Sequence, residues 1–266
     1  MTLRTPMDLA SLDIDRLKEI ALRAGEAVMA VYQSEFAVEH KDDRSPLTEA
    51  DRRSNEVILA GLKETWPEVP VISEETKALP WQERRDWEWF WLVDPLDGTK
   101  EFIKRNGEFT VNIALVHQGV PVAGVVGQPV TGRLYWAVSG RGAWRISADS
   151  EEPVLIGGSR HFRELDHVSV VGSRSHLSPE VGAFVQGLEE EGKVVTFRSS
   201  GSSLKLCLVA EGAADVYPRL GPTMEWDTAA ADAVAREAGR RVLDWETREP
   251  LRYNKENLLN PWFVVE

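Results

Sequence analysis

Apolar positions recur at two different spacings along the chain, and each spacing predicts one kind of element. Between residues 13 and 33 they recur every three or four positions, which predicts an amphipathic helix over 13–33. A second helix is expected over 48–65, because Thr48 and, three residues later, Asp51 resemble a capping box with Asp in place of the usual Glu. Two short strands are expected beside these helices, over 36–40 and 71–72.

Runs rich in β-branched and aromatic residues predict a sheet in the middle of the chain. Residues 89–93 form an apolar run that stops at Asp94, which predicts a strand buried on both faces. Trp87, Trp89 and Trp91 alternate there, so we expect one buried strand face rather than a platform for stacking bases. Three further apolar runs, separated by Gly and Pro, predict an antiparallel meander over 111–116, 121–127 and 134–138.

Beyond residue 157 the pattern changes to an alternation of strands and helices. Strands are expected over 168–171, 194–197, 214–217, 241–243 and 263–265. Helices are expected over 179–190, 202–211 and 227–238. Such alternation implies a sheet packed between helices. The predicted fold class is therefore α/β, with an α+β N-terminal domain over 1–157 and an α/β C-terminal domain over 158–266.

Composition and charge mainly exclude partners. The chain has 266 residues, of which 42% are hydrophobic and 28% charged, an ordinary balance for a globular protein. A formal net charge of -12 disfavours nucleic-acid polymers and anionic lipid surfaces. No apolar run is long enough to span a membrane, and no signal-peptide pattern is present. The single cysteine, Cys207, fits a reducing cytoplasm, with peripheral contact at the inner face of the membrane still compatible.

The segment over 91–102 carries the candidate chemistry. Asp94 follows the apolar strand, Pro95 restricts it to extended geometry, and Asp97 comes close enough for two carboxylates to converge. A helix that begins just after Gly98 would direct free N–H groups at a phosphate. Scattered histidines argue against zinc, so carboxylates beside amides indicate a hard cation and metal-assisted phosphoester hydrolysis. The alternative is a strand-exit turn without chemistry.

The same residues resemble a known family. Its motifs are similar to Asp94-Pro95-Leu96-Asp97-Gly98-Thr99, with Glu74-Glu75 upstream and Trp226-Asp227 downstream. That family is the inositol monophosphatase superfamily of metal-dependent, lithium-sensitive phosphatases. Three stretches resemble its 3'(2'),5'-bisphosphate nucleotidases of the CysQ type: 94–115, 199–205 and 217–230. The resemblance spans about 12–264 and implies the layered αβαβα sandwich of the inositol monophosphatase/fructose-1,6-bisphosphatase type.

The resemblance implies a carboxylate metal site. Glu74, Asp94 and the backbone carbonyl of Leu96 would hold a first Mg²⁺. Asp94, Asp97 and Asp227 would hold a second, in a complex of two or three ions. The N-terminal domain would therefore carry most metal ligands, and the C-terminal domain would contribute Asp227 and substrate contacts.

The resemblance also implies that Thr99 and Asp51 position and deprotonate the attacking water, since a threonine alone is a poor base. Residue chemistry leaves alternatives open. Asp51 would also serve as a helix cap without a catalytic role, and Asp227 as an ordinary N-cap. Trp226 is expected in the core, and Glu75 is left outside the metal site.

Substrate contacts are implied at Glu74, Leu96, Asp97, Gly98, Thr99, Lys205, Arg219 and Asp227. In the inositol-specific branch an acidic residue shortly before the Trp-Asp pair contacts a sugar hydroxyl, whereas 218–222 contains Arg219 and no acid. A cation suits a second phosphate better than a neutral polyol, and Lys205 would act likewise. For either cation alone, a solvated surface charge is an equal alternative.

The predicted function is that of a Mg²⁺-dependent phosphomonoesterase in sulfur metabolism. It would hydrolyse a small bisphosphorylated nucleotide, 3'-phosphoadenosine 5'-phosphate, to AMP and phosphate by attack of a metal-activated water. The first alternative is an inositol monophosphatase or related sugar-phosphate phosphatase. An alternative of another class is a non-catalytic nucleotide-binding sensor. The oligomeric state is left open. Ala231, where such sequences often carry Gly, is expected to be tolerated within a helix.

Overall fold

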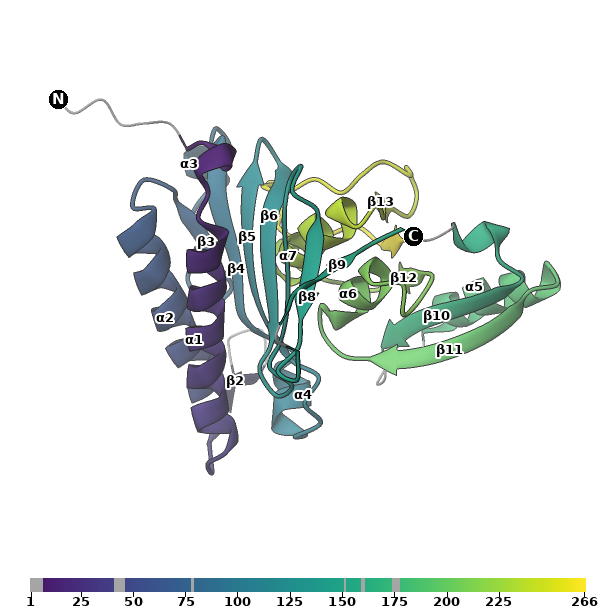
Figure 1. Ribbon diagram of the computed structural model, residues 1–266, viewed down its shortest axis with the longest axis horizontal. Helices are drawn as coiled ribbons and strands as arrows, with labels where there is room; N and C mark the ends of the chain where they lie inside the picture. Colours follow the sequence, from purple (N-terminus) through teal and green to yellow (C-terminus); the bar gives the residue numbers. More distant parts are fainter. Residues whose placement is uncertain (1–6, 41–45, 78, 151, 159–160, 174–177) are drawn as a thin grey trace.

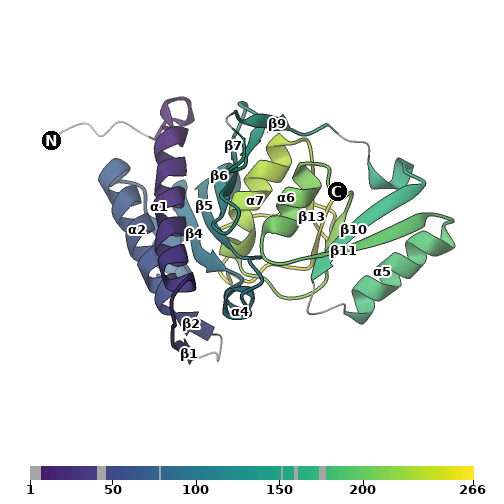
Figure 2. The ribbon, with the colours of Figure 1, turned by 60° about the horizontal axis from the view of Figure 1, so that its bottom comes forward.

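The structure, a computed structural model, describes residues 7–40, 46–77, 79–150, 152–158, 161–173 and 178–266. Its elements stack in five layers of helices and strands, and these layers are seen side by side in Figures 1 and 2. The predicted α/β class and the layered αβαβα order are confirmed. Within the described ranges, no helix combines the length and the apolar character that crossing a membrane requires.

The first two layers are a helix pair and a large sheet. Helices α1 (Ile14–Tyr32) and α2 (Glu49–Thr65) confirm the two predicted amphipathic helices. The sheet has seven strands in sequential order: β3 (Val71–Ser73), β4 (Trp89–Asp97), β5 (Thr110–His117), β6 (Val120–Gln128), β7 (Arg133–Val138), β8 (Ala143–Ile146) and β9 (Val154–Ile156). Strands β3 and β4 are parallel, and every later pair is antiparallel, so the predicted meander is confirmed and continues into β8 and β9.

The third layer is formed by helices α6 (Leu204–Ala210) and α7 (Glu225–Glu237), which lie on the opposite face of this sheet from α1 and α2 (Figure 1). A Cβ added to Gly124 of β6 would collide with the backbone carbonyl of Ala230 in α7. The helix therefore lies directly on the strand, and only glycine admits this close approach. As a result, the first turn of α7 is fixed against the sheet that carries β4.

The outer layers are smaller. Strand β10 (His167–Ser173) pairs in parallel with β11 (Val194–Ser200), and helix α5 (Pro179–Glu190) covers the outside. A three-stranded sheet has the order β12 (Tyr217–Arg219), β14 (Phe263–Val265) and β13 (Val242–Asp244). The domain boundary near residue 157 stays a prediction: the chain leaves the large sheet there, yet α6 and α7 pack back onto it.

Several element boundaries differ from the predictions. The strand predicted over 214–217 lies later, because β12 pairs with β14 and only Val216 forms an isolated bridge to Val170. Strand β4 does not stop at Asp94 but runs on to Asp97. Trp87 precedes β4 and packs in the core on the other side of the sheet from Trp89 and Trp91. Short elements without a periodic pattern were not predicted: η1 (Leu9–Ser11), β2 (Pro46–Thr48), α3 (Trp81–Arg84) and η2 (Phe162–Glu164), whereas β1 (Val38–His40) lies within a predicted strand.

Candidate active site

Two of the predicted carboxylates lie at an irregular end of β4. Asp94 pairs with Asn112 of β5 and Asp97 pairs with Thr110, so β4 advances three residues where β5 advances two. Such a β-bulge bends the strand and re-aims its side chains. Asp94 is buried, and its Oδ1 accepts a hydrogen bond from the Leu96 amide at 3.0 Å. The bulge thus turns both carboxylates toward one end of the sheet.

Gly98 converts the strand into a helix. Its φ of 91° lies in the left-handed region that favours glycine, and an added Cβ would lie 3.1 Å from the Glu108 carbonyl oxygen. Helix α4 (Thr99–Ile103) follows directly. The helix predicted to begin after Gly98 is therefore confirmed, although it has only five residues.

Asp51 is buried and is shared between two tasks. Its Oδ2 accepts hydrogen bonds of 2.7 Å from both the amide and the hydroxyl of Thr48, which completes the predicted capping box of α2. Its Oδ1 accepts from the Thr99 hydroxyl at 3.3 Å, and the Leu96 carbonyl oxygen is an equally distant acceptor for that hydroxyl. The capping geometry and the geometry needed for a catalytic pair therefore coexist in one carboxylate.

Asp227 comes to the same region from the C-terminal half. It is not the N-cap of α7: the N-cap is Met224, and Asp227 is the third residue of the helix, where its Oδ2 accepts from the Met224 amide at 2.9 Å. The turn is held by Glu225, a fully buried carboxylate that accepts from the amides of Asn254 (2.6 Å) and Lys255 (2.9 Å). A loop near the C-terminus thereby fixes the place of Asp227.

The acidic side chains raise one another's pKa values. Burial, followed by the charges of Glu74, Asp97 and Asp227, raises the pKa of Asp94 well above its usual range. Burial and the charge of Asp97 do the same for Asp227. The pKa of Asp97 rises to about 6 through burial, partly offset by the charge of Lys205 and by the Ser203 amide. The four predicted acidic ligands therefore lie close enough to interact electrostatically with one another.

This donor set fits a hard divalent cation. The groups are oxygen donors, they come from three separate elements, and their mutual repulsion would be relieved by positive charge. Among the side chains that the structure describes, no three carboxylates, imidazoles or thiols already form a closed ligand set. The acidic groups share a region without yet surrounding a single point.

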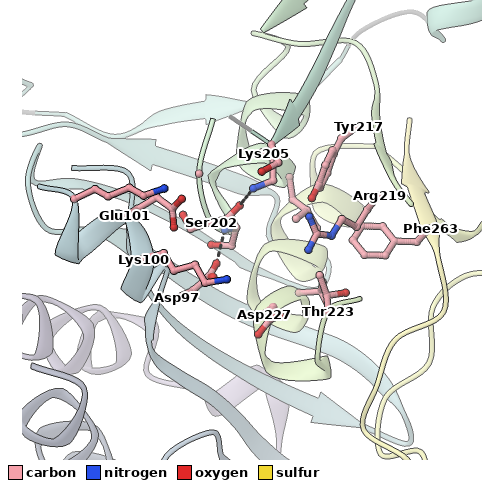
Figure 3. A pocket seen from close by; sticks show the side chains of 17 residues that line it. Asp97, Lys100, Glu101, Ser202, Lys205, Tyr217, Arg219, Thr223, Asp227 and Phe263 are labelled. Atoms are coloured by element: carbon pink, nitrogen blue, oxygen red, sulfur yellow. Dashed lines mark hydrogen bonds between the residues drawn. The ribbon is translucent and has the colours of Figure 1, made fainter. Parts of the chain in front are cut away.

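A cavity of about 370 Å³ opens next to these carboxylates (Figure 3). Asp97 and Asp227 line one side of it, and the rings of Tyr217 and Phe263 meet edge to face at 5.8 Å on another. Four basic side chains also line it: Lys100, Lys104, Lys205 and Arg219. The cavity joins an acidic end to a cationic end, although the chain as a whole is strongly acidic.

The two predicted cationic residues differ in how they are held. Lys205 is 6% exposed, and its Nζ donates to the carbonyl oxygens of Ser202 at 2.7 Å and Ser200 at 3.4 Å. Burial lowers the pKa of Lys205 to about 8, against the opposing charge of Asp97. Arg219 donates from Nη2 to the Pro222 carbonyl at 2.8 Å, while its buried Nε has no acceptor in the described structure. Neither side chain is fully solvated, so the alternative of a solvated surface charge does not apply to Lys205 or to Arg219.

The sequence interpretation missed the residues that anchor Asp97. The Ser203 amide donates to Asp97 Oδ2 at 2.5 Å, and the Ser203 hydroxyl lies 2.7–2.8 Å from Asn112 Oδ1 and Thr110 Oγ1. The serine-rich stretch 199–205 was noticed only for its resemblance, and nothing in its pattern indicated a contact with β4. Trp226 packs against the core, as expected. Glu75 is partly buried, and Ala231 is fully buried within α7.

Comparisons with known proteins define the class. A model of the inositol monophosphatase family matches residues 12–262. The chain is 46% identical over 254 residues to the 3'(2'),5'-bisphosphate nucleotidase CysQ of Salmonella typhimurium, covering 95% of this chain and 98% of that one. It is 47% identical over 255 residues to the CysQ nucleotidase of Escherichia coli K12, covering 95% and 98%. The crystal structure of CysQ from Bacteroides thetaiotaomicron superposes with a TM-score of 0.83 at 48% identity, covering 97% and 98%.

The chain belongs to the inositol monophosphatase family. Within that family it is similar over nearly its whole length to the CysQ-type bisphosphate nucleotidases. The resemblance inferred from the motifs, down to this branch, is thereby confirmed.

Proposed function

We propose that this chain is a Mg²⁺-dependent phosphomonoesterase that converts 3'-phosphoadenosine 5'-phosphate to AMP and phosphate. The observation that carries the proposal is a cavity that lies beside mutually repelling carboxylates at one end and is lined by basic side chains at the other. The acidic end suits a metal and a scissile phosphate, and the cationic end suits a second phosphate. The similarity to CysQ nucleotidases supports the same substrate class.

The metal would be held by Glu74, Asp94, Asp97, Asp227 and the Leu96 carbonyl. When bound, Mg²⁺ supplies positive charge that acidifies a water molecule and offsets the charge of the phosphoryl oxygens. The bulge that aims Asp94 and Asp97, and the clamp that fixes Asp227, prepare these oxygens before any ligand arrives. That the ion is Mg²⁺, and that two or three ions bind, is also proposed.

The chain's own residues would move the proton. The Thr99 hydroxyl has acceptors at 3.3 Å on both Asp51 and Leu96, so its hydrogen is directed at one of them and its lone pairs are left for a water proton. Asp51 is the base that would receive that proton through Thr99. Its second oxygen is fixed by Thr48, which keeps Oδ1 facing Thr99.

Substrate selection would depend on the cationic end. Arg219 is anchored by one nitrogen and keeps an unsatisfied buried donor, which suits a phosphate oxygen. Lys205 contributes charge while it holds the turn at 200–202. The amides of Gly98 and Thr99 would serve the scissile phosphate.

The test compares two substrates under identical conditions. Phosphate release from 3'-phosphoadenosine 5'-phosphate and from inositol 1-phosphate is measured with Mg²⁺, for the wild type and for Arg219→Ala. The proposal predicts a strong preference for the bisphosphate and at least a partial loss of that preference in the variant. A preference of the wild type for the inositol ester would transfer the chain to the inositol-specific branch, and binding of the nucleotide without turnover would make it a sensor. Lithium is expected to inhibit the wild type.

A further inference from the structure

Lys100 lines the cavity but has no place in the chemistry described so far. It is the second residue of α4, directly after Thr99, and so belongs to the N-terminal half of the chain. Figure 3 shows its side chain extending into the cavity from the wall that faces Arg219. The structure gives the Lys100 ammonium no hydrogen bond and no ion pair with any described residue. Its charge is therefore available to a ligand.

Lys205, which lines the same cavity, differs from Lys100 because its ammonium is hydrogen-bonded to the protein. Its ammonium is buried and donates to two backbone carbonyls, so it is fixed in the wall. Lys100 is exposed and unanchored, so it is free to move toward an anion. Of these two cations, Lys100 can follow a substrate and Lys205 cannot.

The facing residue, Arg219, has one donor without an acceptor. Its Nη2 is anchored on Pro222 at 2.8 Å, but its Nε is buried without a partner among the described residues. A buried donor without an acceptor destabilises the fold. An oxygen of a bound anion would accept a hydrogen bond from this Nε and remove that penalty. Lys100 and the partly anchored Arg219 thus face the same space from opposite walls.

We propose that Lys100 binds the non-scissile phosphate of the substrate together with Arg219, and that it is a specificity-determining residue. This inference rests on the proposed function. The phosphate to be cleaved must lie at the carboxylates, so the phosphate left over is the one within reach of the cations. Contacts from an ammonium on one side and a guanidinium on the other are charge-assisted and favour a dianion. The substrate would bridge the two halves of the chain.

The test is a kinetic comparison of a bisphosphate with a monophosphate. KM and kcat are measured with 3'-phosphoadenosine 5'-phosphate and with adenosine 3'-monophosphate, which lacks the second phosphate. In Lys100→Ala, KM for the bisphosphate is expected to rise about tenfold, as for one lost charge-assisted contact, while KM for the monophosphate changes less than about twofold. Lys100→Arg keeps the charge and should restore most of the affinity. Lys63→Ala, an exposed lysine on α2, controls for a general loss of positive charge.

The outcomes separate this inference from the proposed function. An equal rise in KM for both substrates, or no rise for the bisphosphate, would overturn the role of Lys100 while an active wild type keeps the proposed function. A wild type that releases no phosphate from the bisphosphate would overturn both. If Lys100→Ala does not fold, as judged by its melting transition, Lys100→Gln gives the same comparison.

Discussion

The two ends of the cavity are built in different ways. The acidic end uses β4, a nine-residue strand buried through most of its length, and the first turns of α2 and α7, which pack against the large sheet. The cationic end uses a three-residue strand, β12, a turn at 200–202 and the exposed face of the short helix α4. Under the proposed function, the long central elements would carry the step common to phosphatases, and the short peripheral elements would select the ester. Such a division allows the substrate to change while the chemistry is kept.

The largest effect is expected when the acidic end loses the carboxylate of Asp94, which is predicted to hold both metal ions. Asp94→Asn should lower kcat by roughly 10³-fold, because it removes a carboxylate that interacts with Glu74, Asp97 and Asp227. The fold should survive, since the amide keeps the size of the side chain and relieves repulsion. Activity and the melting temperature are measured together. A variant with substantial activity would contradict the shared role of Asp94.

A smaller loss is expected when the proton path is cut. Thr99→Ala should lower kcat by about 10²-fold with a small change in stability, because it removes the hydroxyl that faces Asp51 and one methyl group of a half-buried side chain. Thr48→Ala is the matched control: it removes the hydroxyl that donates to the other oxygen of Asp51, while the backbone amide of residue 48 still donates, and it should cost about 1 kcal/mol of stability with a minor effect on kcat. Thr99→Ser should retain activity. If Thr48→Ala lost as much activity as Thr99→Ala, capping alone would explain Asp51.

The clamp formed by Glu225 and the backbone amides of Asn254 and Lys255, which fixes the first turn of α7, gives an intermediate effect. Glu225→Gln weakens the hold of the C-terminal loop on the first turn of α7, so Asp227 should be less well placed. The Mg²⁺ concentration for half-maximal activity is expected to rise about tenfold, with kcat at saturating Mg²⁺ nearly unchanged. Lys255→Ala removes the ion pair with Glu225 and the ammonium hydrogen bonds to Arg252 and Asn260, but keeps the backbone amide bonds to Glu225, and should have a weaker effect. Unaltered Mg²⁺ dependence in both variants would show that the contacts of Glu225 do not influence metal binding.

The smallest effect concerns the stability of the metal-free protein. The pKa of Asp97 in the fold is about 6, above the roughly 3.9 of an unfolded chain, so the fold prefers the protonated acid. The free energy of unfolding should be highest below about pH 4 as far as this group is concerned, and this contribution is lost as the pH rises through about 6. Melting temperatures in chelator across that range measure it, with Asp97→Asn as the control. Saturating Mg²⁺ should reverse the trend.

The contrast between the two ends also explains what the sequence could predict. The run from Asp94 to Thr99 is contiguous and lies after a strongly apolar strand, so its residue types and spacing indicated the pair of carboxylates and the helix start, but not the bulge that carries β4 on to Asp97. The Thr48–Asp51 pair was recognisable because capping is a local interaction. In contrast, the hydrogen bond from Ser203 to Asp97 joins residues 106 positions apart. No local pattern encodes such a contact.

Peripheral elements were predicted least well for a related reason. Strand β12 is held by β14, almost fifty residues later, rather than by its own β propensity, and so was placed too early. The position of Asp227 in α7 depends on Glu225 and its loop partners, which shift the start of the helix before the apolar pattern begins. Lys100 gave no signal in the sequence, since only the fold brings it opposite Arg219.

Removal and return of the metal tests whether the clustered carboxylates act as one cation-dependent centre. Phosphate release from 3'-phosphoadenosine 5'-phosphate is followed for the untreated wild type, after exhaustive chelation, and after Mg²⁺ is added back. We expect activity to vanish on chelation and to return with Mg²⁺ in the wild type, but not in Asp94→Asn or Asp227→Asn. Full activity in the chelated enzyme would show that Glu74, Asp94, Asp97 and Asp227 do not hold a metal needed for the reaction.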